Sequence, residues 1–208
     1  MIVYLAVKEV TLTDVETFAM RLRAFMMHSF QNQILFRSSM SAGNFRSVDD
    51  ATNTVMGAAV SDAASRYDKA NWIGVAATPR ATMFIQSLLE REGKNLDHVL
   101  VDHHVPMKPP LPAVSVKAVN WPKAFYVRGL RPKLPGGARA MLLSYLAKHQ
   151  VPLGTESKYS NTVAFFDTIR EKQELGSERT TVKVMPGVSG QAPLLKVTHR
   201  VGDPGPKT

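Results

Sequence analysis

The stretch 55–67, VMGAAVSDAASRY, and the stretch 71–79, NWIGVAATP, decide the fold. Together they predict a glycine turn, a small-residue helix over about residues 58–70 and a buried strand. Small side chains let a helix approach a sheet closely, so we expect four alanines to be packed there: Ala58, Ala59, Ala63 and Ala64. Polar Ser61, Asp62 and Ser65 leave a second interpretation, in which the start of this helix faces a ligand.

Further strands and helices alternate on both sides of this stretch. Apolar and β-branched runs predict strands over residues 2–7, 33–45, 72–78, 98–108 and 113–121. Apolar residues at helical spacing predict helices over 13–29, 79–92, 138–149 and 157–174, and a turn is expected over 47–53. Thr13 with Glu16 matches a capping box, and Thr78 followed by Pro79 matches a helix start that Gly93 would end. This order predicts an α/β sandwich, with helices packed on a sheet.

Composition narrows the kinds of protein. The chain has 208 residues, of which 44% are hydrophobic and 21% charged, typical of one globular domain with a core. It has no cysteine, which excludes disulfides and thiolate chemistry and favours a cytoplasmic location. No apolar run is long enough to cross a bilayer, and MIVYLAVKEV at residues 1–10 has no basic leader, so we expect neither membrane association nor a signal peptide.

The formal net charge of +9 favours anionic partners such as nucleotides or nucleic acid. The lysines and arginines are spread along the chain and are not interleaved with aromatic residues, so nucleic acid is the less favoured partner.

Three stretches in this order are similar to a known family: FRSSMSAGNF at 36–45, NTVMGAAVSDAASRYDKANWIGVAATP at 53–79, and VPMK to VKAVNWP over 105–122, with KYSNTVAFF at 158–166 further on. They resemble the class III nucleotidyl cyclase homology domain, and most of all its bacterial anti-phage branch, the Pycsar-type cytidylate and uridylate cyclases. The resemblance implies a ferredoxin-like fold with a mixed, mainly antiparallel sheet. It implies a cyclase-like domain over residues 1–175, followed by an extension over 176–208 that is partly disordered.

The resemblance also implies site residues. Aligning Gly57 and Val60 with the family puts Ser61 where the family has an asparagine and Ser65 where it has an arginine. Arg66 then follows one position late, which turns it by about 100° around the helix. The implied catalytic residues are Arg37, Ser61, Ser65 and Arg66, and the implied nucleotide-binding residues are Asn53, Thr54 and Gly57.

Metal ions are the main departure from the family. Its members use Mg²⁺ or Mn²⁺ held by two aspartates, both of which precede the strand that here is predicted at 2–7. The resemblance therefore implies that the segment with both ligands is missing from this chain, and we expect no metal ligand in it. Such ligands would have to come from a longer chain or from a partner, because these active sites form between two paired domains. A homodimer is expected, and an inactive relative of the family is the remaining explanation.

Two local features have simpler interpretations. Arg37 lies in an apolar strand, where an arginine paired at a sheet edge is the main alternative to one near a substrate groove. In DHVLVDHH at 97–104, alternation puts Asp97 with His103 on one face and His98, Asp102 and His104 on the other. A solvated strand edge is favoured there over a metal site, which needs three ligands. Trp72 and Trp121 are expected in the core.

Two functions remain open from the sequence. The first is a nucleotidyl cyclase, which would form a 3′,5′-cyclic nucleotide from a nucleoside triphosphate, in anti-phage signalling, if the metal ligands are supplied. The second is an inactive dimerisation or regulatory module with the same fold.

Overall fold

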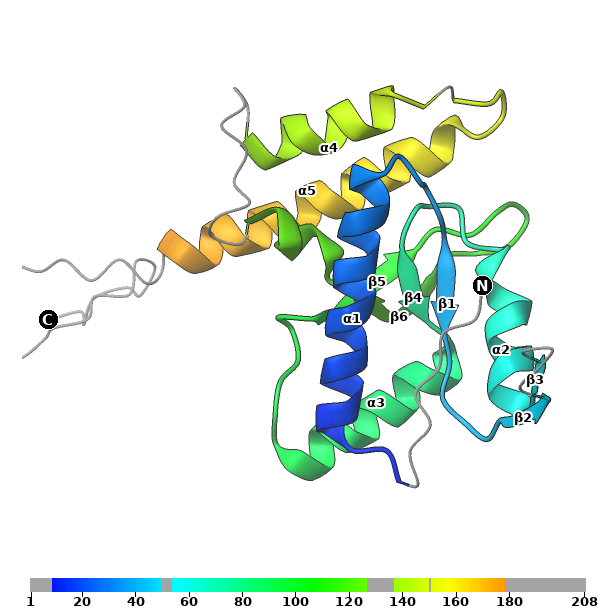
Figure 1. Ribbon diagram of the computed structural model, residues 1–208. Coiled ribbons are helices and arrows are strands. Elements are labelled where there is room, and N and C mark those ends of the chain that lie inside the picture. Colours follow the sequence, from blue (N-terminus) through cyan, green and yellow to red (C-terminus); the bar gives the residue numbers. More distant parts are fainter. Residues whose placement is uncertain (1–8, 50–53, 127–136, 150, 179–208) are drawn as a thin grey trace, which may run out of the picture.

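The computed structural model describes residues 9–49, 54–126, 137–149 and 151–178. Its centre is a four-stranded mixed sheet in the order β1-β4-β6-β5 (Figure 1). β1 (Ser38–Met40) is parallel to β4 (Val75–Ala77), whereas β6 (Val114–Val119) is antiparallel to both β4 and β5 (Leu100–Val105). A separate hairpin is formed by β2 (Arg46–Asp49) and β3 (Thr54–Met56). The α/β class that the sequence predicts is therefore confirmed.

The strand register decides which side chains share a face of the sheet. Val101 pairs with Ala118, His103 with Val116 and Val105 with Val114, and directly opposed residues of antiparallel strands point to the same side. Ala76 pairs with Ala118 and with Ser39, so small residues from β1, β4 and β6 continue this face. The other face carries buried Val75, Ala77 and Val119, among others.

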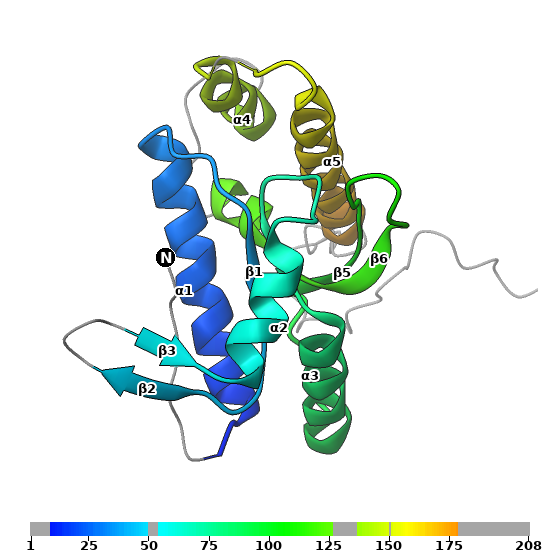
Figure 2. The same cartoon turned by 90° about the vertical axis from the view of Figure 1, so that its right-hand side faces the viewer.

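Helices pack against the sheet through apolar residues that recur at helical spacing in their sequences. α1 (Leu12–Gln31) and α3 (Pro79–Glu92) contact each other and β6, and α2 (Ala58–Tyr67) lies across β1 from α1 (Figures 1 and 2). Apolar residues recur along α1 at helical spacing and are buried: Leu12, Val15, Ala19, Leu22 and Met26.

The far end of the core is aromatic. η1, a 3₁₀ helix over Trp121–Tyr126, packs against α1 and against α5 (Glu156–Glu178), which also pairs with α4 (Gly137–Ala147). Fully buried rings meet there, and Trp72 and Trp121 are both in the core as predicted: Trp72, Trp121, Phe30, Phe125, Phe165 and Phe166. Aromatic side chains of this size account for a large share of the apolar area removed from water.

Several predicted boundaries are wrong. α1 is capped by Thr11 with Asp14 and not by Thr13 with Glu16, because the Thr11 hydroxyl accepts from the Asp14 amide and Asp14 reaches back to Thr11. The strand predicted over 33–45 shrinks to β1, and part of the turn predicted over 47–53 is strand β2. The strand predicted over 72–78 is reduced to β4, after a bend at 72–74. α3 begins at Pro79 and ends before Gly93 as predicted, with Thr78 as its cap.

The predicted burial of the small-residue helix is also wrong. α2 contacts β1 and β3, but none of its residues is buried: Ala58 and Ala64 are exposed, and Ala59 and Ala63 are half-buried. This helix therefore stands beside the edge strand β1 as a lightly covered element, and its alanines reflect helix propensity more than core packing.

Some predictions lie outside the described residues, namely the strand at 2–7 and the disordered extension beyond 178. Among the helices that are described, none is both long and apolar enough to cross a membrane.

Candidate functional site

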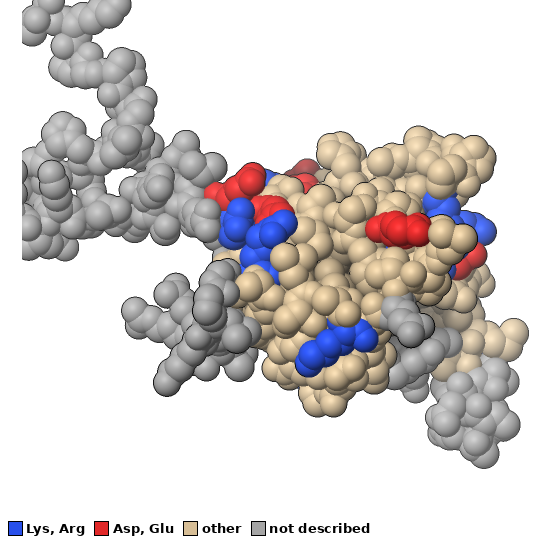
Figure 3. Space-filling model, turned by 90° about the horizontal axis from the view of Figure 1, so that it is seen from above, with Lys and Arg blue, Asp and Glu red and all other residues tan. Residues whose placement is uncertain are grey.

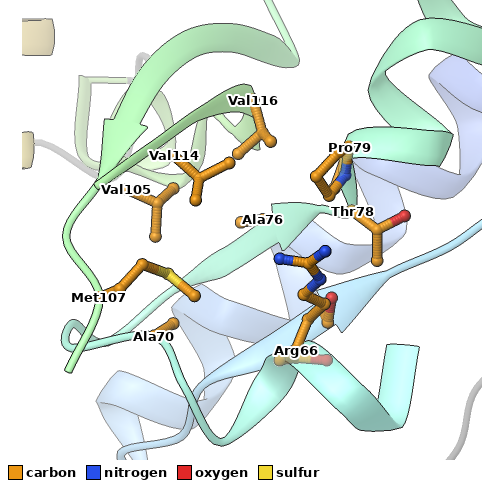
Figure 4. Close-up of a pocket in the computed structure, with 12 residues that line it drawn as sticks. Arg66, Ala70, Ala76, Thr78, Pro79, Val105, Met107, Val114 and Val116 are labelled. Atoms are coloured by element: carbon orange, nitrogen blue, oxygen red, sulfur yellow. The ribbon is translucent and has the colours of Figure 1, made fainter. Parts of the chain in front are cut away.

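A solvent-open hollow lies on the sheet face that Ala76 and Val116 occupy, between α2 and the strands (Figure 4). It is shallow, with an enclosed volume of only about 30 Å³. The floor and far wall are apolar, and the polar lining comes from Ser38, Ser39, Thr78 and Arg66. The apolar lining residues are Ala70, Ala76, Ala77, Pro79, Val105, Met107, Val114 and Val116. The recess is therefore a shallow, mostly apolar surface with a few polar groups beside it.

The position of α2 over this hollow is fixed by one carboxylate. The Oδ2 atom of Asp62 accepts hydrogen bonds from the hydroxyls of Ser41, after β1, and Thr78, after β4, both at 2.5 Å. The Thr78 hydroxyl in turn accepts from the Ala81 amide, which caps α3. Asp62 thus joins α2 to the ends of two adjacent strands and to the start of α3, and we call Asp62, Ser41 and Thr78 the Asp62 clamp.

The clamp also orients Arg66. Residues four apart lie on the same side of a helix, so the side chain of Arg66 follows Asp62 one turn later toward the sheet. Figure 4 shows its guanidinium group extending over the hollow toward Thr78 and Pro79. Within the described part of the chain, the exposed side chain of Arg66 has neither a hydrogen bond nor an ion pair, and it lies at the edge of a mostly apolar recess. A free guanidinium in such a place is suited to an anionic ligand.

The other predicted catalytic residues do not join Arg66 in the hollow. Ser61 is exposed, and exposed Ser65 donates its hydroxyl to the carbonyl of Asp62 within the same helix. Arg37 is half-buried at the start of β1, where its Nη1 donates to the carbonyl oxygen of Ala70 at 3.0 Å. Because Ala70 lines the hollow, Arg37 lies just behind its wall. Its hydrogen-bond partner is a backbone carbonyl and not the carboxylate that a paired arginine at a sheet edge would have.

Of the predicted nucleotide-binding residues, the two that the structure describes, Thr54 and Gly57, do not line the hollow. Asn53 lies outside the described residues, and Thr54 begins β3 in the outer hairpin. Gly57 caps the start of α2 with φ 142°, and a Cβ atom there would lie 2.6 Å from the carbonyl oxygen of Asn44 and 2.7 Å from the Cα of Phe45. The glycine is required because the hairpin backbone passes against it, which is a structural reason for this residue and not a ligand contact.

The sequence indicated Asp62 only as one of the polar residues at the start of α2 and Thr78 only as a helix cap, so it missed their contact with each other, and it missed Ser39 altogether. Asp62 carried a usable signal, because it is the one acidic residue of α2 and stands four residues before Arg66. Ser39 and Thr78 carried none, since their roles depend on strand pairing that places Ser39 beside Ala76 and ends β4 one residue before Thr78.

A two-metal centre does not fit the residues described. No group of three or more histidine, aspartate or glutamate side chains converges anywhere in the described ranges. The carboxylate beside the hollow, Asp62, already accepts two hydroxyl donors on one oxygen. We therefore assign no step of any reaction to a metal held by these residues.

The histidine and aspartate cluster at 97–104 is also accounted for by pairings. Asp102 is 2.9 Å from the Nζ of Lys117, and the His104 Nδ1 is 2.7 Å from the Ser115 hydroxyl, so both pair with β6. His98 contacts Glu16 of α1 at 2.6 Å. His103 packs between Trp72 and Phe165, where burial, followed by the nearby His104 and Lys172, lowers its pKa to about 4. The cluster is therefore a set of separate contacts and not a metal site.

Comparison with models of known protein families, with curated proteins and with solved structures found no match for the chain.

Proposed function

We propose that this chain is a nucleotide-binding protein of the cyclase-homology type, with a ferredoxin-like arrangement, and that a nucleoside triphosphate lies across the shallow hollow under Arg66. The observation that carries the proposal is the unpaired Arg66 guanidinium over an apolar recess. The net charge of +9 favours an anionic ligand, and the ordered motifs from residue 36 to residue 166 support the same ligand class.

The hollow divides into parts that suit the parts of a nucleotide. Its alanine and valine floor, with Met107, offers an apolar surface for a base or the faces of a ribose. The hydroxyl of Thr78 and the side chains of Ser38 and Ser39 offer hydrogen-bonding groups beside that floor. Arg66 presents a planar set of donors that matches phosphate oxygens in pairs.

Turnover is a separate part of the proposal. Cyclisation is an attack of the ribose 3′-oxygen on the α-phosphorus, in which pyrophosphate leaves and the hydroxyl proton is lost to a base. Arg66 would neutralise charge that develops on the phosphate oxygens. Acidic metal ligands would have to come from outside the described residues, and a paired partner domain that carries them is the source that we propose.

Titration calorimetry with ATP, GTP, CTP and UTP, each in the presence of Mn²⁺, tests the binding step. We expect at least one triphosphate to bind, and Arg66→Ala to weaken it at least tenfold. Arg91→Ala removes the same charge from the exposed end of α3, away from the hollow, and should leave affinity unchanged. Binding of none of the four nucleotides, or equal losses in both variants, would contradict the proposal.

A non-catalytic dimerisation or regulatory module is the second candidate. It is favoured by the lack of a convergent acidic group among the described residues. Chromatographic assay for cyclic nucleotide and pyrophosphate, together with light scattering for the oligomeric state, separates the two. Product from any triphosphate supports the cyclase, whereas nucleotide binding by a dimer without product supports the module.

A further inference from the structure

We propose that the open edge of β5 is a docking site for the C-terminal end of a partner polypeptide. The partner binds as an added antiparallel strand, and its terminal carboxylate is held by Lys123 and Lys172. This site is separate from the hollow under Arg66 and does not depend on the proposed nucleotide binding. Two features carry it: free backbone groups along β5, and a second hollow at the start of that strand.

The backbone of β5 has one edge without a partner strand in the described part of the chain. On its other side, the Asn120 amide donates to the Val99 carbonyl at 2.8 Å, and the Lys117 amide turns away from β5 to a hydroxyl of α3 at 3.1 Å. Hydrogen-bonded and non-hydrogen-bonded pairs alternate along an antiparallel ladder. The amide and carbonyl groups of Asp102 and His104 therefore point to the open edge.

This edge lacks the usual protection against an added strand. Edge strands are commonly very short, contain proline or lysine, or are interrupted by a bulge. β1, at the other edge of the sheet, has three residues and contacts α2, whereas β5 has six residues in unbroken register with β6. β5 contains neither proline nor lysine, and its carboxylate, Asp102, is paired with Lys117 at 2.9 Å. An extended chain can therefore prolong the sheet here through backbone hydrogen bonds, which is a recurring mode of peptide recognition.

The start of β5 decides where such a strand would end. The Leu100 amide is already bonded to the Leu96 carbonyl at 2.8 Å, so the outward ladder stops after Asp102. A hollow of about 390 Å³ opens at this point, and its lining comes from β5, η1 and α5 among other segments. An antiparallel strand runs toward the start of β5, so its carboxyl terminus would lie in this hollow, which we call the edge hollow.

The edge hollow offers an apolar floor and two free ammonium groups. Val101 and Ile169 line it and are buried. The residue opposite Val101 in an added strand has its side chain on the same face as Val101, so an apolar last side chain would contact this floor. Lys123 of η1 is half-buried and Lys172 of α5 is exposed. Neither lysine side chain has a hydrogen bond or an ion pair with a described residue.

The other charged or titratable residues of this lining have partners within the fold. Asp97 accepts from a side-chain amide at 2.8 Å, Asp102 has its ion pair, and His98 contacts a glutamate of α1 at 2.6 Å. Burial, and then the positive charge of Arg23, lower the pKa of Lys123. A carboxylate beside Lys123 would stabilise its charged form, and charge-assisted hydrogen bonds to ammonium groups are among the stronger ones.

The surface charge around this end of the fold favours a peptide terminus over nucleic acid. Figure 3 shows lysine and arginine side chains, with acidic ones beside them, at the end of the molecule toward which α5 runs. A nucleic acid footprint is instead a basic stripe along a face. The partner class is therefore an extended polypeptide with a free carboxylate and an apolar last residue.

The first test uses the full chain and a library of hexapeptides of randomised sequence, attached through their N-termini. We expect the chain to select peptides with an apolar last residue, and amidation of their carboxyl ends to weaken binding by about tenfold or more. Lys123→Gln with Lys172→Gln should bind the free peptide as weakly as the wild type binds the amidated one. The control, Arg80→Gln with Lys148→Gln, removes two exposed cations outside the lining of the edge hollow and should bind like the wild type.

The second test addresses the backbone ladder. His104→Pro removes an amide that points to the open edge and takes no part in the ladder with β6, a position at which an edge strand accommodates proline. We expect it to weaken the selected peptide by about tenfold, because the added strand loses a backbone hydrogen bond and the proline ring obstructs the edge. His104→Ala removes the same side chain but keeps the amide, so it should bind like the wild type. Melting temperatures check that each variant is folded.

Several results would overturn the proposal. Selection of no peptide, or equal binding of the free and amidated forms, removes the carboxylate site. Equal affinity in the two lysine and arginine double variants does the same. Equal affinity in His104→Pro and His104→Ala removes the added strand. If light scattering shows a wild-type dimer that His104→Pro dissociates, the edge binds a second copy of this chain and not a partner's C-terminus.

Discussion

The Asp62 carboxylate joins α2 to the ends of β1 and β4 and to the start of α3 through a single oxygen atom. A substitution of Asp62 should therefore change the stability of the protein. Ser41 and Thr78 each donate a 2.5 Å hydrogen bond to this oxygen. We expect Asp62→Ala to lower the free energy of unfolding by about 1–3 kcal/mol, because hydrogen bonds to charged groups contribute more than neutral ones. The same change should weaken triphosphate binding, since Arg66 loses the anchor one turn before it. Urea denaturation and calorimetry measure the two effects.

Two neighbouring variants make this prediction specific. Asp62→Asn keeps an oxygen acceptor of nearly the same shape, so it should recover a large part of both the stability and the affinity. Ser61→Ala changes an exposed hydroxyl on another side of the same helix, and we expect no measurable change. If Asp62→Asn and Asp62→Ala behave alike, the clamp does not act through its hydrogen bonds.

At the scale of elements, one buried hydroxyl joins α5 to the segment that precedes β4. Thr162 is fully buried, accepts from the Ile73 amide at 2.8 Å and donates to the Lys158 carbonyl within the helix. Thr162→Val has nearly the same shape but leaves the Ile73 amide without a partner. A buried unpaired amide costs about 1–3 kcal/mol, so we expect that loss in unfolding free energy from urea denaturation.

A second threonine on α5 serves as a matched control. Thr168 makes the same kind of bond to its own helix, to the Ala164 carbonyl at 2.9 Å, but is exposed. Thr168→Val should change stability by less than about 0.5 kcal/mol. Equal losses in the two variants would show that the effect comes from the helix alone and not from its attachment to Ile73.

Elements with strong local signals were predictable from the sequence. α3 begins at Pro79 and ends before Gly93, because a capping threonine, a proline and a left-handed glycine all fix its limits locally. The pair β5 and β6 was predictable for a similar reason, since six-residue strands rich in valine flank the proline-rich loop at 109–112.

Elements that depend on distant contacts were not predictable in this way. β1 has three residues, and its partner in the sheet is β4, which lies beyond a hairpin and a helix in the sequence. The register of this pair sets which residues line the hollow, and no local pattern encodes it. Arg66 was therefore a predicted residue, but its position beside the hollow depends on this register and on the hydrogen bonds of Asp62.

For the whole molecule, the pH dependence of stability provides a test of the core. His103 lies with its ring centre 5.1 Å from that of Trp72 and 4.5 Å from that of Phe165, and its Nε2 atom is buried with no hydrogen-bond partner. Burial first, then His104 and Lys172, lower its pKa to about 4, against a usual value of 6.5. The folded state therefore keeps this ring neutral at a pH at which the unfolded chain protonates it.

The sign of the effect follows from this difference. Above pH 6.5 the ring is neutral in both states, and its contribution does not vary with pH. As the pH falls from 6.5 to 4, the unfolded state binds a proton that the folded state does not, so stability decreases, and below pH 4 the loss levels off. We expect His103 to account for roughly 2 kcal/mol of this loss, after allowing for the part of the ring that solvent reaches.

The variant His103→Phe isolates this contribution, because it keeps a ring between Trp72 and Phe165 and removes the titrating group. Urea denaturation at several pH values from 7.5 to 4 should show a shallower decline for this variant than for the wild type. His28→Gln removes an exposed histidine from α1 and should retain the wild-type profile. Carboxylates titrate in the same range in all three proteins, so only the differences between their stability curves report on His103. If the curves of His103→Phe and the wild type are parallel, water reaches this part of the core and the prediction is wrong.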